Sequence, residues 1–315
     1  MNAIDQQRLS KEQRREHRRR RLRRKGRRAY IRSVYSLPSL ATLGNAVCGF
    51  GAMYIAGLDS GTPTMDHWTS FFAQRPFIAA AYLIFLAMIF DALDGRLARF
   101  TRHTTDFGGQ LDSLADAVSF GVAPAFLALQ LFRDYVTDAH IALPVVLSRL
   151  IWAVAALFMS CALLRLARFN VSNQHGEQHH FSFLGLPSPG AAGAVASFAL
   201  MQQDLLHSKI AFFERLSTIC VWLLPIVVLL TGLLMVSTFR YPHLVNRYLR
   251  GKRSLARLIG VLVLALLVVV AHQYTIAIGS MIYALWGPVS WAYLRSKPKT
   301  AAETPTPLPQ SSPRP

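Results

Sequence analysis

The chain alternates long apolar blocks with short polar segments, and this alternation is the main structural signal in the sequence. Several blocks approach the roughly 20 residues that a helix needs to cross the hydrocarbon core of a bilayer, and the shorter blocks gain length from their flanks. The pattern therefore predicts an all-α integral membrane protein with about eight transmembrane helices. The eight blocks begin at or near Ser39, Pro76, Asp116, Leu143, Leu186, Thr218, Leu255 and Thr275.

Buried helices of a large soluble protein are the alternative interpretation of these blocks. Such helices rarely follow one another eight times at this length. The composition also points away from a soluble protein, because 52% of the residues are hydrophobic.

Charge is unevenly distributed along the chain, which carries 34 Lys and Arg residues against 16 Asp and Glu residues. If the N-terminus is cytoplasmic and there are eight spans, every basic cluster falls on the cytoplasmic side. The intervening loops 57–75, 133–142 and 204–217 carry few Lys or Arg residues, as the positive-inside rule requires. The basic clusters lie within residues 11–32, 96–102, 165–168, 239–257 and 294–299.

These patterns divide the chain into three parts. Residues 1–33 form a basic, cytoplasmic arm, which we expect to be attracted to anionic lipid head groups. The arm holds a single Phe, Tyr or Trp residue, Tyr30 near its end, so we expect no specific nucleic-acid partner. Residues 34–296 form the transmembrane domain, and residues 297–315 form a Pro-rich tail that we expect to be disordered.

Two pairs of aspartates stand beside the second and third apolar blocks. Asp91 and Asp94 are three residues apart, and Asp112 and Asp116 are four residues apart, so each pair shares one face of a helix. The segment 103–109 between them reads as a turn. Two antiparallel helices joined by this turn would bring all four carboxylates together at the cytoplasmic edge of the bilayer.

Four negative charges in one small volume repel one another, and ionisable groups in a span require a partner or a function. Carboxylate ligands favour hard cations such as Mg²⁺, Mn²⁺ or Ca²⁺. Arg96 and Arg99 are available for an anionic substrate, so the combination suggests phosphate chemistry. Gly95 and Gly108 would allow close approach of a phosphate, and the small Ala98 would leave room for a flat ring.

The residues from Asp91 to Asp116 fill every fixed position of the pattern D-x2-D-G-x2-A-R-x8-G-x3-D-x3-D, and this pattern resembles the signature of the CDP-alcohol phosphotransferase family. The resemblance implies a membrane enzyme in which a hydroxyl group displaces CMP from a CDP-linked alcohol, with Mg²⁺ or Mn²⁺ as cofactor. It implies that Asp91, Asp94, Asp112 and Asp116 bind the metal, with Asp116 also acting as general base. The residues implied to line the CDP site are Gly95, Ala98, Arg99 and Gly108.

Sequence segments outside the signature resemble the bacterial, membrane-integral phosphatidylserine synthases within this family. The similar runs are LPSLATLGNAVCGFGAM, FGGQLDSLADAVSFGVAPAF, LLRLARFNV and FLGLPSPGAAG. This resemblance implies CDP-diacylglycerol and L-serine as substrates, with membrane lipids around them. It also implies the bacterial inner membrane, a cytoplasmic active site and a homodimer.

The acceptor site is open to two interpretations. Arg165 and Arg168 lie at the cytoplasmic end of the fourth block, level with the aspartates in this topology. They could hold a serine carboxylate or, equally, a lipid phosphate, and they could also be ordinary flanking charges. Asn170 and Ser188 could supply neutral hydrogen bonds. The segment 186–189 interrupts the helical pattern and could bring backbone groups into the site.

Three other functions are compatible with parts of this pattern. A phosphatidylglycerophosphate synthase would use the same aspartates with a different acceptor. A cation transporter would use intramembrane aspartates as an ion path, but this leaves the Gly, Ala and Arg positions unexplained. An inactive membrane scaffold would not need the complete signature.

Overall fold

The computed structural model describes residues 40–58, 75–101, 106–174, 182–208, 210–242 and 267–296. The basic arm at residues 1–33 and the Pro-rich tail at residues 297–315 lie outside the described residues. Most of the seventh expected block also lies outside them, because the description resumes only at Leu267.

The described residues are almost entirely helical. After a first helix, Leu40–Ala56, the chain forms α3 (Pro76–Thr101), α4 (Asp106–Asp116), the π-helix η1 (Ala117–Val122), α5 (Ala123–Asp138), α6 (Val145–Gln174), α7 (Ser188–Leu206), α8 (Ala211–Val236) and α11 (His272–Ser296). Two short strands, β1 (Ser182–Leu184) and β2 (Arg240–Pro242), pair antiparallel with Phe183 opposite Tyr241.

Four segments of the described chain are long and apolar enough to cross a membrane: Pro76–Leu97, Phe107–Asp138, Val145–Val171 and Ala211–Val236. Large apolar side chains on these segments point outward, as lipid-facing residues do. This confirms an all-helical membrane protein, apart from the β1–β2 ribbon. The Leu40–Ala56 helix, α7 and α11 cover three further expected blocks without belonging to these four, so the total of eight spans stays a prediction.

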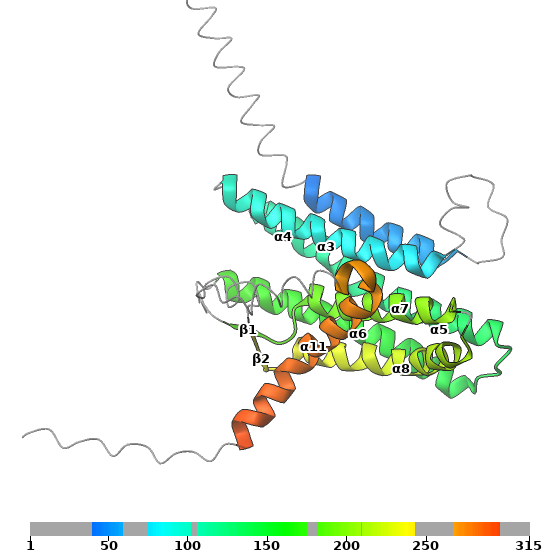
Figure 1. Ribbon diagram of the computed structural model, residues 1–315. Helices are drawn as coiled ribbons and strands as arrows, with labels where there is room; N and C mark the ends of the chain where they lie inside the picture. The colour runs from blue at the N-terminus through cyan, green and yellow to red at the C-terminus, as the bar shows by residue number, and fades with distance from the viewer. Residues whose placement is uncertain are drawn as a thin grey trace, which may run out of the picture.

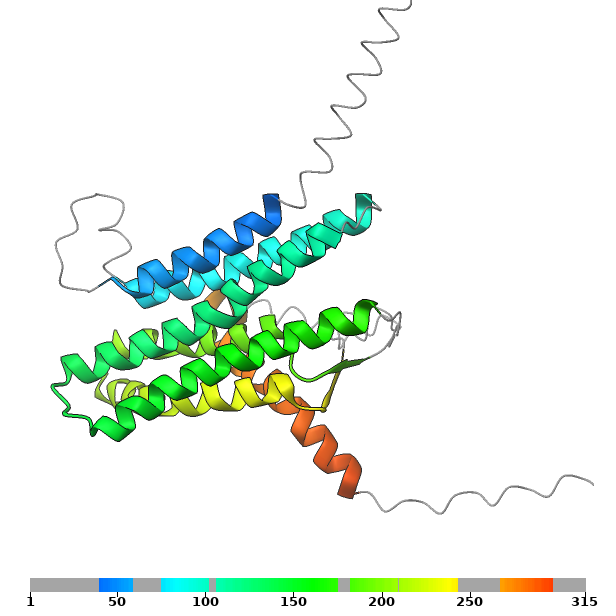
Figure 2. The same cartoon turned by 180° about the vertical axis from the view of Figure 1, so that it is seen from behind.

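The helices pack around α7. The Leu40–Ala56 helix, α3 and α4 run along one side of the bundle, and α6 and α8 run along the opposite side (Figures 1 and 2). α7 packs against α3, α5, α8 and α11 and is buried along most of its length. Small residues allow this close packing: a Cβ atom on Gly193 would lie 3.3 Å from the Cε atom of Met88 on α3.

The third span begins earlier than the sequence pattern predicts. Of the turn expected at 103–109, the part from Asp106 onward is wrong, because α4 begins there and includes Gly108 and Gly109, while residues 103–105 lie outside the described residues. Packing in the bundle overrides the low helix propensity of these glycines. α4, η1 and α5 therefore form one continuous helix that passes from one side of the bundle to the other (Figure 2), and Asp112 and Asp116 lie inside it.

The β1–β2 ribbon fastens α11 to the rest of the bundle. Gly185 follows β1 with a φ of +80°, and a Cβ atom there would lie 2.4 Å from the carbonyl oxygen of Met235, so only glycine fits this turn. From β2, the fully buried Tyr241 donates a hydrogen bond of 2.8 Å to the carbonyl of Ala284 on α11. Burial raises the pKa of Tyr241 to about 12, so its hydroxyl stays protonated and remains a donor at neutral pH.

Candidate functional site

Three of the four signature aspartates converge in the structure. One carboxylate oxygen each of Asp91 on α3 and of Asp112 and Asp116 on α4 lie within 4.8 Å of one another. Asp94, which is only 5% exposed, interacts electrostatically with both Asp112 and Asp116. The two helices therefore bring four like charges into one small volume near the edge of the bundle, and these charges repel one another.

The carboxylate cluster formed by Asp91, Asp94, Asp112 and Asp116 fits a divalent cation. Asp94 Oδ2 and Asp112 Oδ1 are buried and have no hydrogen-bond partner among the described residues. A buried carboxylate oxygen without a partner is costly, so these atoms require a cation or another ligand. Because the donors are all carboxylate oxygens, hard cations are favoured over zinc.

The first helix holds the carboxylate cluster from the side. Asn45 Nδ2 donates a hydrogen bond of 3.0 Å to Asp116 Oδ1, and the side chain of Thr42 bonds to Asp94. Sequence reasoning missed both residues. The signal that could have found them is the presence of buried polar side chains inside an otherwise apolar block, since such residues are costly in a membrane.

Asn45 is itself placed by a tight contact between the first helix and η1. Ser119 Oγ donates a buried hydrogen bond of 2.8 Å to the carbonyl of Asn45. A Cβ atom on Gly49 would lie 2.4 Å from Ser119 Oγ and 2.7 Å from Ser119 Cα. The glycine therefore permits the close approach that brings Asn45 to Asp116.

The residues expected to line a CDP site are only partly described. Gly95 lies on α3, and a Cβ atom there would meet no atom of the described residues within 4 Å, so among these residues the helix is open beside Asp94. Gly108 lies on α4. Ala98 and Arg99 belong to α3, but their side chains lie outside the described set.

Two of the four expected acceptor residues meet directly. Arg165 on α6 donates a hydrogen bond of 3.1 Å from Nη1 to the hydroxyl of the buried Ser188, the first residue of α7. Its Nε atom is buried and has no partner among the described residues. The guanidinium also interacts electrostatically with Asp116, so this cation lies within electrostatic range of the carboxylate cluster.

The other two acceptor residues lie elsewhere on α6. Asn170 and Ser113 exchange hydrogen bonds, with Asn170 Nδ2 lying 2.9 Å from Ser113 Oγ, and this contact joins the end of α6 to α4. The side chain of Arg168 is exposed. Arg165 and Ser188 therefore form one unit next to Asp116, while Asn170 supports α4 and Arg168 lies on the surface.

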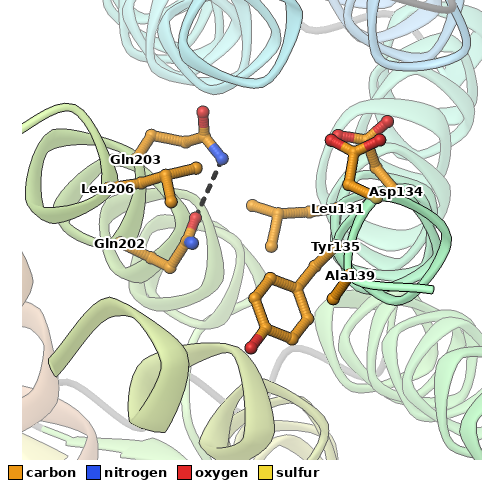
Figure 3. Close-up of a pocket in the computed structure, with 8 residues that line it drawn as sticks. Leu131, Asp134, Tyr135, Ala139, Gln202, Gln203 and Leu206 are labelled. Atoms are coloured by element: carbon orange, nitrogen blue, oxygen red, sulfur yellow. Dashed lines mark hydrogen bonds between the residues drawn. The ribbon is translucent and has the colours of Figure 1, made fainter. Parts of the chain in front are cut away.

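A separate recess of about 230 Å³ opens at the other end of α5 and α7. Figure 3 shows Asp134 and Tyr135 on the opposite side of this recess from Gln202 and Gln203, and Gln203 Nε2 donates a hydrogen bond of 2.9 Å to Gln202 Oε1. Asp134 is 18 helical residues beyond Asp116, which places it about 27 Å away. The recess is therefore distinct from the carboxylate cluster.

Residues 35–236 match the CDP-alcohol phosphatidyltransferase family. The chain belongs to this family. The matched range contains the carboxylate cluster, Arg165 and Ser188, and it ends at the last residue of α8.

Individual members of the CDP-alcohol phosphatidyltransferase family are similar over much of the chain. A CDP-diacylglycerol–serine O-phosphatidyltransferase from Helicobacter pylori is 33% identical over 267 residues, which cover 85% of this chain and 95% of that relative. One of the same description from Methanocaldococcus jannaschii is 37% identical over 52% of this chain and 64% of its own length. An archaetidylserine synthase from Methanothermobacter thermautotrophicus is 31% identical over 68% of this chain and 72% of its own length.

Proposed function

We propose that the protein is a phosphatidylserine synthase, which transfers the phosphatidyl group of CDP-diacylglycerol to the hydroxyl of L-serine and releases CMP. The convergence of the signature aspartates beside a half-buried arginine carries this proposal. The choice of serine is supported by the similarity to the Helicobacter pylori serine transferase, which extends over 95% of that relative.

The roles of the carboxylates follow from their chemistry. Asp91, Asp94, Asp112 and Asp116 would bind Mg²⁺ or Mn²⁺, and the bound metal would polarise the diphosphate and neutralise its charge. The hydrogen bond from Asn45 fixes the orientation of the Asp116 carboxylate. Asp116 takes the proton of the serine hydroxyl as that oxygen attacks the phosphorus nearer the diacylglycerol, and CMP leaves.

The remaining site residues bind the two substrates. Gly95, Ala98, Arg99 and Gly108 line the CDP site, where the open side of α3 at Gly95 supports close approach of the nucleotide. Arg165 binds the serine carboxylate. Its hydrogen bond to Ser188 orients the guanidinium, and its buried Nε, which has no partner among the described residues, is left to donate to the carboxylate. Arg168 and Asn170 complete this end of the site. Arg168 adds a positive charge at the surface, and Asn170 supports α4 by its hydrogen bond to Ser113.

We place this domain, residues 34–296, in the bacterial inner membrane with eight spans. Both termini and the carboxylate cluster face the cytoplasm, which agrees with the positions of the basic clusters. CDP-diacylglycerol would reach the site from the cytoplasmic leaflet, with its acyl chains remaining in lipid. We also propose a homodimer.

The decisive experiment is CMP release by the purified, detergent-solubilised protein. The protein is offered CDP-diacylglycerol with L-serine, glycerol 3-phosphate, inositol phosphate or choline in turn, with Mg²⁺ or Mn²⁺ present. We expect release with serine, and loss of release when a chelator removes the metal, because nothing would then polarise the diphosphate or neutralise its charge.

The other outcomes separate the rival functions. Release with glycerol 3-phosphate but not with serine would identify a phosphatidylglycerophosphate synthase. Metal flux into proteoliposomes without CMP release would instead identify a cation transporter.

A further inference from the structure

The amide group of Asn45 is fully buried beside Asp116, and only half of it is satisfied. Its Nδ2 donates a hydrogen bond of 3.0 Å to Asp116 Oδ1, whereas its Oδ1 is buried and has no hydrogen-bond partner in the described part of the chain. An unpaired amide oxygen is costly in a buried position, so a ligand with a donor group is expected there. Orientation of Asp116 uses Nδ2 alone and leaves Oδ1 without a role.

Two contacts fix the orientation of this amide. An ionised carboxylate only accepts hydrogen bonds, so Nδ2 rather than Oδ1 must face Asp116. The backbone of Asn45 is held as well, because Ser119 Oγ donates a hydrogen bond of 2.8 Å to its carbonyl. Oδ1 therefore cannot turn toward another donor without breaking the bond to Asp116. Since Oδ1 is only two short bonds from Nδ2, it lies within about 6 Å of the Asp116 oxygen.

The charges around Asn45 favour a cationic donor at Oδ1. Asp116 is one of the four aspartates of the carboxylate cluster, whose combined negative charge exceeds the positive charge of one divalent ion. A neutral hydroxyl group would satisfy Oδ1 but would gain little from these carboxylates. An ammonium group supplies both an N–H donor and a positive charge.

We propose that Asn45 Oδ1 accepts a hydrogen bond from the ammonium group of the acceptor and thereby selects amino alcohols; this rests on the proposed function. In serine the hydroxyl and ammonium groups are on neighbouring carbon atoms, so both can reach two side chains that are hydrogen-bonded to each other. The hydroxyl lies on Asp116 and the ammonium on Asn45. With Arg165 on the carboxylate, L-serine is held at three points, and its mirror image can satisfy only two of them.

The first test needs no substitution. Calorimetric titration of the full-length enzyme, with CDP and Mg²⁺ present, compares L-alanine with propanoate, which differ only in the ammonium group. We expect L-alanine to bind about 10- to 100-fold more tightly, the scale of a hydrogen bond to a charged group. Equal affinities would overturn the ammonium site without recourse to any variant.

Two variants then separate Oδ1 of Asn45 from Nδ2. Asn45→Leu removes both polar atoms at similar size, whereas Asn45→Asp keeps an oxygen acceptor and loses the donor, so kcat should fall in both. The informative quantity is the ratio of kcat/KM for L-serine to that for 3-hydroxypropanoate, which lacks the ammonium group. We expect this ratio to shrink about 10- to 100-fold in Asn45→Leu and to be retained in Asn45→Asp.

Ser119→Ala is the matched control. It removes the hydrogen bond to the carbonyl of Asn45 but leaves both polar atoms of the Asn45 side chain in place. Any loss of activity should therefore be equal for L-serine and 3-hydroxypropanoate, with their ratio unchanged.

The remaining outcomes contradict the role of Oδ1. An unchanged ratio in Asn45→Leu, or an equal loss in Asn45→Asp, would overturn it. Weaker Mn²⁺ binding by Asn45→Leu together with an unchanged ratio would make Oδ1 a metal ligand instead. Each of these results leaves the proposed function intact. CMP release by the unchanged enzyme only with alcohols that lack an ammonium group would overturn both.

Discussion

Asp116 is held by a side chain 71 positions away, since Asn45 donates to its Oδ1. The same carboxylate interacts electrostatically with Asp91, Asp94 and Asp112. The neutral donor Asn45 thus orients the carboxylate of Asp116, while the surrounding like charges favour its uptake of a proton during the reaction.

Replacing Asp116 by asparagine should therefore abolish turnover while the nucleotide still binds. The amide keeps the size of the side chain but cannot accept the proton, so we expect CMP release to fall by about 100- to 10,000-fold. Calorimetric titration with CDP in the presence of Mg²⁺ measures binding. Asp138→Asn, an exposed carboxylate at the other end of α5, is the control and should remain active. Comparable activity of the two variants would remove the assignment of Asp116 as base.

Single residues of the site differ in how far the sequence could predict them. The spacings Asp91–Asp94 and Asp112–Asp116 place each pair on one helix face, and this needs only helical periodicity. The contact of Asn45 with Asp116 depends on how two distant helices dock, which no local pattern encodes. Likewise, Arg165 and Arg168 look equivalent in sequence, and only the packing of α7 against α6 distinguishes the half-buried Arg165 from the exposed Arg168.

Of the contacts between described helices, the one between the first helix and η1 leaves the least room for an added side chain. A Cβ atom on Gly49 would lie 2.7 Å from Ser119 Cα, whereas among the described residues one on Gly51, two residues later, would meet nothing closer than Leu83 Cδ1 at 3.4 Å. The two glycines therefore provide a matched pair on one helix.

Gly49→Ala should push the first helix away from η1 and lower both stability and CMP release. Overpacking of this kind costs about 1–3 kcal/mol, and it would also lengthen the bond from Asn45 to Asp116. Thermal unfolding in detergent and the serine-dependent rate measure the two effects. Gly51→Ala should resemble the unchanged protein, because its new methyl group makes only ordinary contacts. Equal behaviour of the two alanine variants would show that this contact does not position Asn45.

The hydrophobic pattern predicted the helices better than their ends or their internal geometry. Apolar blocks of about 20 residues specify a spanning helix on hydropathy alone. They do not distinguish an α-helical turn from the π-helical turn of η1, because both bury the same apolar residues. The β1–β2 ribbon is three residues per strand and offers too little alternation to be recognised.

On the scale of the whole molecule, the proposed chemistry lies at one end of the bundle. The ends of α3 and α6 and the beginnings of α4 and α7 meet there, joined by the Arg165–Ser188 and Asn170–Ser113 hydrogen bonds. The recess lined by Gln202 and Gln203 lies at the other end. Basic clusters in the sequence predicted which elements share an end, because the positive-inside rule acts on the chain as a whole.

Cysteine labelling should reveal opposite exposure of the two ends. The native Cys48, Cys161 and Cys220 are free and buried, so they provide a low background. Cysteine at Ala139, exposed after α5, should react with a membrane-impermeant maleimide in intact spheroplasts, and cysteine at the exposed Arg96 should react only in inverted vesicles. The reverse pattern would place the carboxylate cluster outside the cytoplasm.

The π-helical turn of η1 sits directly between the aspartates and the buried face of α5. A π-turn bonds residue i to i+5 and accommodates about one surplus residue in the helix. Removing one residue from this stretch would restore a regular helix, yet would swing everything before it by roughly 100° about the axis. Asp112 and Asp116 would then turn away from α3, although the lipid-facing residues of α5 would stay in place. The rotation of α4 relative to α5 about their common axis is thus set by one additional residue in η1.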